Sequence, residues 1–378
     1  MAAMEKNNKT LNVPHLRFPE FSGEWEKELL GTTCKVLMCK RILASQTNSD
    51  CGVPFYKIGT IGGVPDAYIS KELFESYRAK YNYPRKGEVM ITCAGTVGKA
   101  MIFDGHDSYY QDSNIVWIDN PTNTIDNTFL YHFISKVDWS KLNTTTIVRI
   151  YNDDLRQLWI SYPTLSEQRK ISIFLNLLNQ RIETQKKIIE DLKKLKDVIR
   201  TKLFRQIEST CSVYDEIRNM LDYEQPSEYL VNSTEYSDDY QIPVLTANKA
   251  FILGYTDEAY GIYDKRNCII LDDFTMDVKY VTFPFKVKSS AIKILTAKQH
   301  VDLYFMYEYL LYLGLVSEEH KRHYISEIES MNIVSPPLET QKHIAQTLQT
   351  ISMKIESATS YYGLLSKQKQ YLLNQLFI

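Results

Sequence analysis

The chain lacks the features that mark several common protein classes. Its six cysteines include no Cys-x-x-Cys pair, so neither a zinc site nor a disulfide framework is indicated. Reduced thiols of this kind are typical of cytoplasmic proteins. The N-terminus is polar, and the most apolar run, residues 303–316, is too short for a membrane span and contains Glu308. We therefore expect a soluble cytoplasmic protein with no membrane partner.

An excess of positive charge is also missing. The formal net charge is −2, whereas a domain that binds nucleic acid is usually basic. The distribution is uneven, because residues 165–205 carry 11 basic and 5 acidic side chains while residues 206–335 carry 11 basic and 21 acidic ones. DNA binding by the second of these regions would have to depend on local basic clusters on an acidic body.

Convincing catalytic motifs are absent as well. The segment Gly95-Thr-Val-Gly-Lys99 lacks both the earlier glycine and the following hydroxyl residue of a phosphate-binding loop, so it favours a tight turn between two strands. The Asn/Asp-Pro-Pro-aromatic tetrapeptide of adenine methyltransferases does not occur. A nuclease pattern can be placed on Asp264 or Asp272 with Asp277 and Lys279, but matches this short are common by chance. The sequence predicts no catalytic residue and no metal site.

The chain does contain two copies of one long-helix sequence pattern, 173 residues apart. The first copy begins at Pro163-Thr-Leu-Ser-Glu-Gln168 and the second at Pro336-Pro-Leu-Glu-Thr-Gln341, and each closes in Leu-Phe. Proline before the first turn marks both starts, and Thr164 with Glu167 predicts a capping box. Apolar residues alternate at spacings of four and three, which is the signature of a coiled coil. The expected seam, which is also the expected partner-binding surface, consists of Ile171, Leu175, Leu178, Ile182, Ile189, Leu192 and Ile199, and of Ile344, Leu348, Ile351, Ile355, Leu365 and Leu372.

A globular segment of mixed character precedes each long helix. β-Branched and aromatic runs predict strands at 55–58, 88–92, 114–118, 242–245, 268–271, 280–283 and 291–295, and helices are expected at 127–136 and 303–315. The 173-residue offset continues back into these helices, where Leu130 meets Leu303. The predicted organisation is a flexible N-terminus (1–14), a first domain (15–162), a long helix (163–205), a second domain (206–335) and a second long helix (336–378).

Several motifs resemble the specificity subunits of type I restriction–modification enzymes. Leu16-Arg-Phe-Pro-Glu-Phe-Ser-Gly-Glu-Trp25 is similar to the opening of that family, and the doubled Pro-x-Leu-x-x-Gln-x-x-Ile is similar to the head of its long helices. Residues 86–99 look like a Gly-Asp-strand-Gly-Thr-x-Gly segment of its target recognition domains, with Glu88 in place of the commoner Asp. Residues 224–229, 242–247 and 271–275 are similar to another recurrent recognition-domain type.

The resemblance implies an α+β fold with two target recognition domains, each followed by a long helix, the two helices pairing as an antiparallel coiled coil. It also implies that the chain is not itself an enzyme. It would read one half of a bipartite double-stranded DNA target with each domain, and modification and restriction subunits would supply adenine methylation or cleavage. No cofactor is expected on this chain, whereas S-adenosylmethionine, ATP and Mg are expected on the partner subunits.

Candidate DNA contacts follow from residue type and position. Hydroxyl, amide and cationic side chains suit phosphate and base-edge contacts. The candidates are Lys57, Thr96, Lys99, Arg149 and Tyr151 in the first half, and Thr246, Asn248, Lys249, Lys286, Lys288, Ser289, Arg322 and Tyr324 in the second. Two alternatives stay open at this stage. One is a DNA-binding chain with its own nuclease activity through Asp277 and Lys279, and the other is a coiled-coil scaffold with two protein-binding heads.

Overall fold

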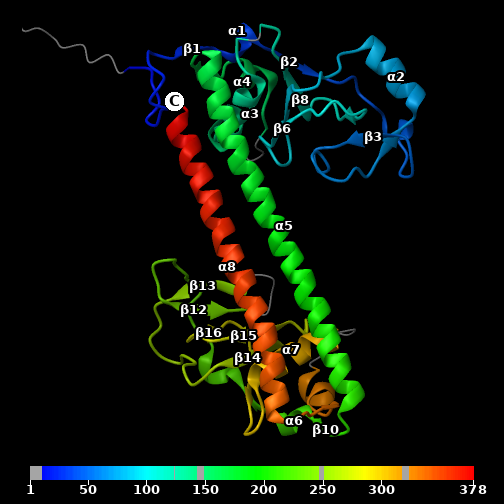
Figure 1. Ribbon diagram of the computed structural model, residues 1–378, viewed down its shortest axis with the longest axis vertical. Helices are drawn as coiled ribbons and strands as arrows, with labels where there is room; N and C mark the ends of the chain where they lie inside the picture. The colour runs from blue at the N-terminus through cyan, green and yellow to red at the C-terminus, as the bar shows by residue number, and fades with distance from the viewer. Residues whose placement is uncertain (1–10, 123, 143–148, 247–250, 317–322) are drawn as a thin grey trace, which may run out of the picture. The chain divides into compact units, whose positions relative to one another are not determined.

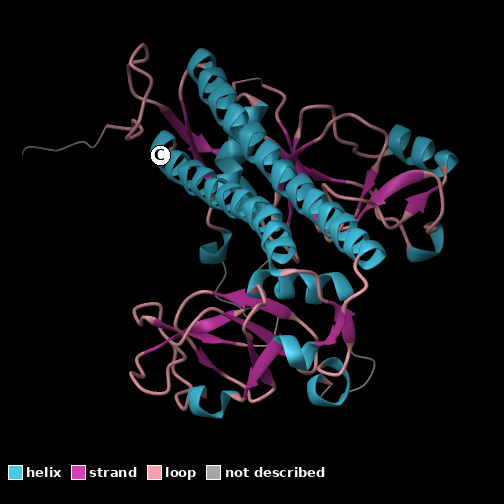
Figure 2. Cartoon of the chain, turned by 60° about the horizontal axis from the view of Figure 1, so that its bottom comes forward, coloured by secondary structure: helices cyan, strands magenta, loops and turns pink. Residues whose placement is uncertain are grey.

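A computed structural model describes residues 11–378 except 123, 143–148, 247–250 and 317–322. The chain divides into two compact units, one formed by residues 1–185 with 361–378 and the other by residues 186–360. Both long helices pass from one unit to the other, so each unit contains half of each (Figure 1). The mixed helix and strand content seen in Figure 2 confirms the predicted fold class.

The first unit is built on a four-stranded sheet with the order β2-β8-β5-β6, a three-stranded sheet β4-β3-β7 and the pair β1-β9. All the strand pairs are antiparallel except β3 with β7. Its strands are β1 (Glu26–Leu29), β2 (Lys35–Met38), β3 (Val53–Tyr56), β4 (Tyr68–Ile69), β5 (Val89–Thr92), β6 (Ala100–Ile102), β7 (Tyr109–Tyr110), β8 (Ile115–Asp119) and β9 (Trp159–Tyr162). Its shorter helices are α1 (Leu30–Thr33), α2 (Lys71–Lys80), α3 (Asn127–Lys136), α4 (Asn152–Arg156), η1 (Ala44–Gln46) and η2 (Trp139–Leu142).

The second unit repeats this topology sheet for sheet. Its sheets have the orders β11-β17-β14-β15, β13-β12-β16 and β10-β18, and β12 with β16 is again the parallel pair. Its strands are β10 (Tyr214–Glu216), β11 (Leu221–Glu224), β12 (Ile242–Leu245), β13 (Ile252–Thr256), β14 (Cys268–Asp272), β15 (Val278–Val281), β16 (Lys286–Val287), β17 (Ile292–Ala297) and β18 (Asn332–Val334). Its shorter helices are α6 (Ile217–Met220), α7 (Leu303–Leu313), η3 (Pro226–Tyr229) and η4 (Tyr324–Ile328). The whole unit is therefore duplicated, as the sequence predicted.

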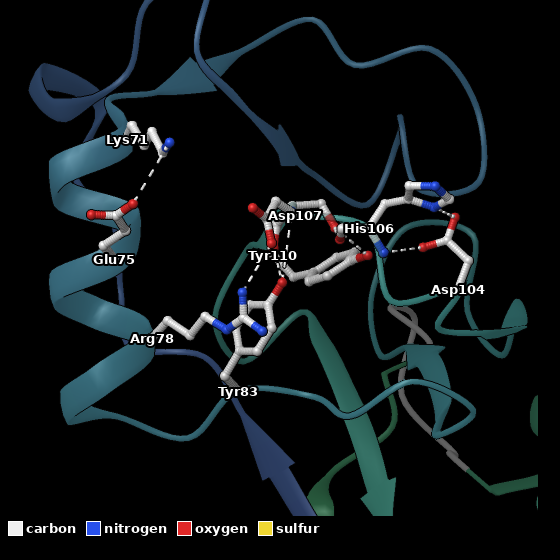
Figure 3. A network of polar contacts seen from close by, with 9 residues as sticks. Lys71, Glu75, Arg78, Tyr83, Asp104, His106, Asp107 and Tyr110 are labelled. Atoms are coloured by element: carbon white, nitrogen blue, oxygen red, sulfur yellow. Dashed lines mark hydrogen bonds and ion pairs between the residues drawn. The ribbon is translucent and has the colours of Figure 1, made fainter.

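The helix α2 is an addition to the first unit, without a counterpart in the described part of the second. Ser70 caps its N-terminus by accepting a hydrogen bond from the Leu73 N–H. Figure 3 shows how its other end is tied to the β6–β7 loop. Arg78 pairs with Asp107 at 2.9 Å and lies over the ring of Tyr83, whose hydroxyl donates to the Ser108 carbonyl.

The long helices are α5 (Leu165–Thr210) and α8 (Leu338–Leu376). In the first unit the start of α5 and the end of α8 share one core, which includes Leu175 and Leu376. In the second unit the end of α5 and the start of α8 share another, which includes Phe204 and Leu348. The helices therefore run in opposite directions, as expected. All thirteen expected seam residues are buried or half-buried.

Each long helix ends against the short helix of the other repeat. Phe204 of α5 packs on Phe305 and Tyr309 of α7, with ring centroids 5.5 and 4.8 Å apart. In the same manner Phe377, just after α8, packs on Phe129 and Phe133 of α3 at 4.8 and 6.3 Å. The Leu-Phe closing of each helix thus packs an aromatic side chain into the core of one unit.

These aromatic pairs correct the predicted alignment of the short helices. Because α3 begins at Asn127 and α7 at Leu303, their spacing is 176 residues rather than the 173 that relates α5 to α8. The match of Leu130 with Leu303 is therefore wrong by three residues. The capping box at Thr164 is also wrong, since Glu167 is turned inward and holds Arg17 at 2.7 and 2.8 Å.

The two long helices begin with the same local geometry, and in each a buried glutamine is responsible for it. Gln168 accepts the Asp126 N–H at 2.7 Å and donates to the Pro163 carbonyl at 2.8 Å. Gln341 does the same with Asp302 and the Pro336 carbonyl, at 3.0 and 2.9 Å. Asp126 and Asp302 are the N-caps of α3 and α7. Each glutamine therefore joins the start of a long helix to the start of the short helix beside it.

Candidate nucleic-acid interface

In the first unit the glycine-containing turn joins β5 to β6, as predicted. Gly98 has a φ of +80°, and a Cβ there would lie 2.0 Å from the Trp139 ring, so a side chain cannot be accommodated. This turn leaves Thr96 and Lys99 exposed. The turn is thus a rigid structural element that presents two of the predicted contact residues.

The loop after β3 adjoins this turn. The Lys99 ammonium donates to the Ile61 carbonyl at 2.6 Å, and a Cβ on Gly95 would lie 2.9 Å from Ile58 Cδ1. Lys57 lies at the start of the same loop, where its ammonium pairs with the exposed carboxylate of Asp66 at 3.0 Å. Lys57, Thr96 and Lys99 therefore occupy adjoining loops.

Arg149 and Tyr151 are held beside the first end of the turn. The Ile150 N–H donates to the Cys93 carbonyl at 2.9 Å. The Arg149 guanidinium lies 5.8 Å from the centroid of the Tyr151 ring and contacts the Ser113 carbonyl at 3.4 Å. These side chains line a cleft formed by Met38, Ser113, Arg149, Ile150, Tyr151, Asn152, Asp153 and Arg156. The first unit thus gathers its five predicted residues near one end of its sheets.

In the second unit two predicted residues lie at the ends of the two parallel strands, and one of them has a predicted counterpart in the first unit. Thr246 follows β12 and Lys288 follows β16, and the Lys288 N–H donates to the Leu245 carbonyl at 2.9 Å. Lys57 follows β3, the counterpart of β12, so Thr246 corresponds to Lys57. Lys288 is exposed, with its ammonium 5.6 Å from the Tyr236 ring centroid, and Ser289 is half-buried next to it.

Two of the predicted contacts are wrong. Lys286 is wholly buried, where it pairs with Glu258 at 2.7 Å and donates to the Tyr260 carbonyl at 2.8 Å. Its cation is used inside the domain and does not reach the surface. Tyr324 is 1% exposed and packs against Tyr223, whereas its repeat mate Tyr151 is 59% exposed.

Other predicted residues fall outside the described part of the chain or have a structural role. Asn248, Lys249 and Arg322 lie outside the described residues. Of the nuclease pattern, Asp277 and Lys279 are exposed, while Asp272 is buried and accepts the Phe274 and Thr275 N–H groups. Among the described residues, no cluster of three or more His, Cys, Asp or Glu side chains could hold a metal ion.

Three buried carboxylates of the second unit form ion pairs inside it. The carboxylate of Asp273 pairs with Lys293 at 3.2 Å, and both groups are buried. Glu258 pairs with Lys286, and Glu308 pairs with Lys196 of α5 at 2.6 Å. Because each buried carboxylate takes at least one cation with it, these pairs leave the acidic excess of the remaining side chains in place.

Four of the six cysteines are buried. All six are free thiols. Burial raises the pKa of Cys34 to about 11 and the pKa values of Cys39, Cys93 and Cys268 to about 12. A thiol with so high a pKa is a poor nucleophile at neutral pH.

Comparison with known proteins decides the family. The sequence profile described as "Type I restriction modification DNA specificity domain" matches residues 22–194 and again residues 220–361. These two matches span most of the chain and coincide with its two repeats. The chain belongs to the type I restriction–modification specificity subunits.

Individual specificity subunits are similar over parts of the chain. The putative subunit S.HindORF215P of Haemophilus influenzae is 54% identical over 38% of this chain and 37% of its own length. The EcoR124I/EcoR124II specificity subunit of Escherichia coli is 40% identical over 41% of each chain. Each of these matches thus spans less than half of the relative. The crystal structure of an S subunit from M. genitalium shares the fold, with a TM-score of 0.65 and 16% identity over 97% of this chain and 99% of that one.

In this specificity subunit, the duplicated topology identifies further candidate DNA contacts that were not predicted from the sequence. The counterpart of the β5–β6 turn is the β14–β15 turn, which exposes Phe274 and Thr275. The segment Leu271-Asp-Asp-Phe-Thr275 stood out in the sequence by its resemblance to a recognition domain. The repeat offset could not locate it, because the spacing of the strands differs from the 173 residues that relate the long helices.

Among the described residues, no helix has both the length and the apolar composition that are needed to cross a bilayer.

Proposed function

We propose that this specificity subunit reads a bipartite double-stranded DNA target, one half-site with each unit, and directs adenine methylation or restriction by partner subunits. The chain itself supplies no chemistry. S-adenosylmethionine, ATP and Mg belong to the modification and restriction subunits in this proposal, and the complex acts in the cytoplasm.

The observation that carries the proposal is the equivalent placement of candidate contacts in two copies of one domain. In each unit they lie at the carboxyl ends of the parallel strands of the small sheet and at the hairpin turn of the four-stranded sheet. Two such surfaces on one chain gain affinity for a two-part site through effective concentration. Phosphate contacts from Lys57, Lys99 and Lys288 would position each domain, and base contacts would supply the sequence preference.

The long helices also expose apolar side chains that suit a partner subunit. In the first unit Ile173 and Leu177 of α5 are 61% and 60% exposed. In the second unit Val198 is 65% exposed and lines a shallow hollow with Asp197, Thr201, Lys202, Arg205, Gln206 and Ser209. Apolar residues flanked by cations fit an amphipathic acidic helix, and we assign this face to the modification subunits.

The experiment is methylome sequencing of a host with and without the gene. A bipartite adenine-methylated motif should be lost with the gene. Thr96→Ala with Lys99→Ala should weaken methylation through one half-site, while Lys288→Ala should act through the other. Lys80→Ala serves as the control and should leave methylation unchanged, because Lys80 is an exposed lysine of α2 that is not among the candidate contacts.

The outcomes that contradict the proposal are distinct. Robust DNA cleavage by the purified chain with Mg²⁺, abolished by Asp277→Ala, would show that it carries its own nuclease. Failure to bind any DNA in the presence of its partner subunits would instead favour a scaffold with two protein-binding heads.

A further inference from the structure

The β14–β15 turn of the second unit exposes an aromatic side chain at the position where the first unit exposes Thr96. Phe274 is 40% exposed, and Thr275 next to it is exposed as well. In both turns an N–H near the end donates back to the last residue of the preceding strand. Gly98 donates to the Thr92 carbonyl at 2.8 Å, and Met276 donates to the Asp272 carbonyl at 3.0 Å. The two turns therefore occupy equivalent positions in the fold, but the second is two residues shorter and exposes different side chains.

Two buried aspartates hold the backbone of this turn. Asp272 Oδ1 accepts the N–H groups of Phe274 and Thr275 at 2.9 and 2.7 Å. Asp273 Oδ1 accepts the N–H groups of His323 and Tyr324 at 2.9 and 2.7 Å, and its Oδ2 pairs with buried Lys293. The exposed aromatic ring therefore belongs to a backbone segment that buried carboxylates hold in place. Precise recognition requires such an arrangement.

The backbone conformation of Met276 also determines which side chains of the turn face outward. Its φ is +61°, in the left-handed region that residues with a side chain rarely adopt, and its side chain is buried. That conformation turns the chain so that Phe274 and Thr275 face outward while Met276 enters the core. Strain of this kind persists only where the surrounding structure enforces it.

The turn also adjoins the other candidate contacts of the unit. The Asp273 N–H donates to the Ala291 carbonyl at 3.1 Å, and the Ala291 N–H donates to Ser289 Oγ at 3.1 Å. Ser289 directly follows Lys288, so the turn and the end of β16 form one surface. The described residues of this surface combine the exposed Lys288 with hydroxyls and an aromatic ring, whereas the first unit offers Lys57, Lys99 and Arg149.

We propose that Phe274 is a specificity-determining residue of the second unit and that it contacts the 5-methyl group of a thymine in the major groove. Thr275 lies beside it and provides a hydroxyl for a neighbouring base edge. Apolar contact with this methyl group is one of the few ways in which an uncharged side chain distinguishes base pairs. Such a contact would give the second unit part of its sequence preference without a charged side chain. The inference rests on the proposed function, because it assumes that the second unit reads a half-site.

The test replaces thymine by deoxyuridine, which removes the methyl group alone. Duplexes carrying the motif found by methylome sequencing, with each thymine of both half-sites replaced in turn, are bound to the chain with its modification subunits. The wild-type complex should lose about fourfold in affinity at one thymine position of one half-site, the value of one buried methyl group. In Phe274→Ala the same replacement should have no effect, while responses in the other half-site stay unchanged.

Phe283→Ala is the matched control, because Phe283 is 38% exposed on the same unit but packs near Phe251. It should preserve the wild-type response to deoxyuridine. The inference is overturned if no thymine of either half-site responds in the wild-type complex, or if Phe274→Ala keeps the full response. If no duplex is bound specifically at all, the proposed function itself fails. That result can be told apart from the two outcomes that overturn only the inference about Phe274.

Discussion

Glu308 of α7 and Arg200 of α5 form a buried ion pair, with Arg200 Nε 2.7 Å from Glu308 Oε2. Lys196, one turn earlier on α5, reaches the other carboxylate oxygen at 2.6 Å, and Glu308 is wholly buried. One carboxylate therefore receives two cations from the C-terminal half of α5. The pairing fixes which face of α5 meets α7, a role for which buried polar groups in helix seams are well suited.

Removing Glu308 should be far more costly than removing an exposed neighbour. Glu308→Leu leaves two cations without their carboxylate and should lower the free energy of unfolding by about 3–5 kcal/mol. Adding Lys196→Met and Arg200→Leu to this variant should recover most of the loss. Asp197→Ala, which removes only the exposed partner of Arg200, should cost less than about 0.5 kcal/mol. Denaturant unfolding of the four proteins checks this, and a triple variant no more stable than Glu308→Leu would contradict it.

In the first unit, the position equivalent to Glu308 holds a histidine instead of a carboxylate. His132 of α3 is wholly buried, as Glu308 is, and its Nε2 lies 3.0 Å from Asn176 Oδ1. The pKa of His132 is lowered to about 4, mainly by burial and in small part by the nearby cation of Lys369, against the opposing effects of Asn176 and Asp126. The histidine is therefore neutral at physiological pH, whereas Glu308 lies in an ion pair with Lys196 and Arg200.

The first unit should consequently lose stability in mild acid. Because the pKa of His132 is lower in the folded chain than the ordinary value of 6.5, the unfolded chain takes up the proton first. The stabilisation is complete above pH 6.5 and declines as the pH falls toward 4, by about 3 kcal/mol in all. Hydrogen exchange of α3 peptides across this range measures the effect. His132→Gln should flatten the dependence, and an equally steep profile in that variant would show that another group is responsible.

The sequence alone predicted much of this fold, for reasons that particular residues make clear. The bounds of α3 were predicted correctly, because Asp126 is a strong N-cap and the apolar spacing is regular. The seam was found because a heptad repeat is a local pattern. Glu167 was misjudged because its partner, Arg17, lies 150 residues away, and no local rule connects the two. Lys286 was misjudged because Glu258 makes the burial of a lysine possible only in the folded domain.

The glutamine of each helix-leading motif has a role that sequence reasoning did not assign. Gln168→Ala should leave the Asp126 N–H and the Pro163 carbonyl without partners, at a cost of about 1–3 kcal/mol. Gln341→Ala should have the same effect at Asp302 and Pro336. Each loss should be confined to its own unit, so hydrogen exchange should rise in α3 for the first variant and in α7 for the second. Exposed Gln180→Ala is the control, and a rise in both helices with either single variant would contradict a local role.

The last prediction separates two lysines that the sequence placed in one patch. Lys288 is exposed, so Lys288→Ala should leave stability unchanged, weaken DNA binding and reduce the slope of log affinity against log salt by about 1. Lys286→Met should do the reverse, because it leaves the buried carboxylate of Glu258 unpaired and destabilises the unit by about 3 kcal/mol or more. Glu258→Gln combined with Lys286→Met should restore part of that stability. Unfolding curves and salt titrations of DNA binding, measured on the same preparations, decide the matter. A Lys286→Met protein that is fully stable but has a reduced salt slope would mean that the buried ion pair opens to bind DNA, and it would reverse the assignment of the two residues.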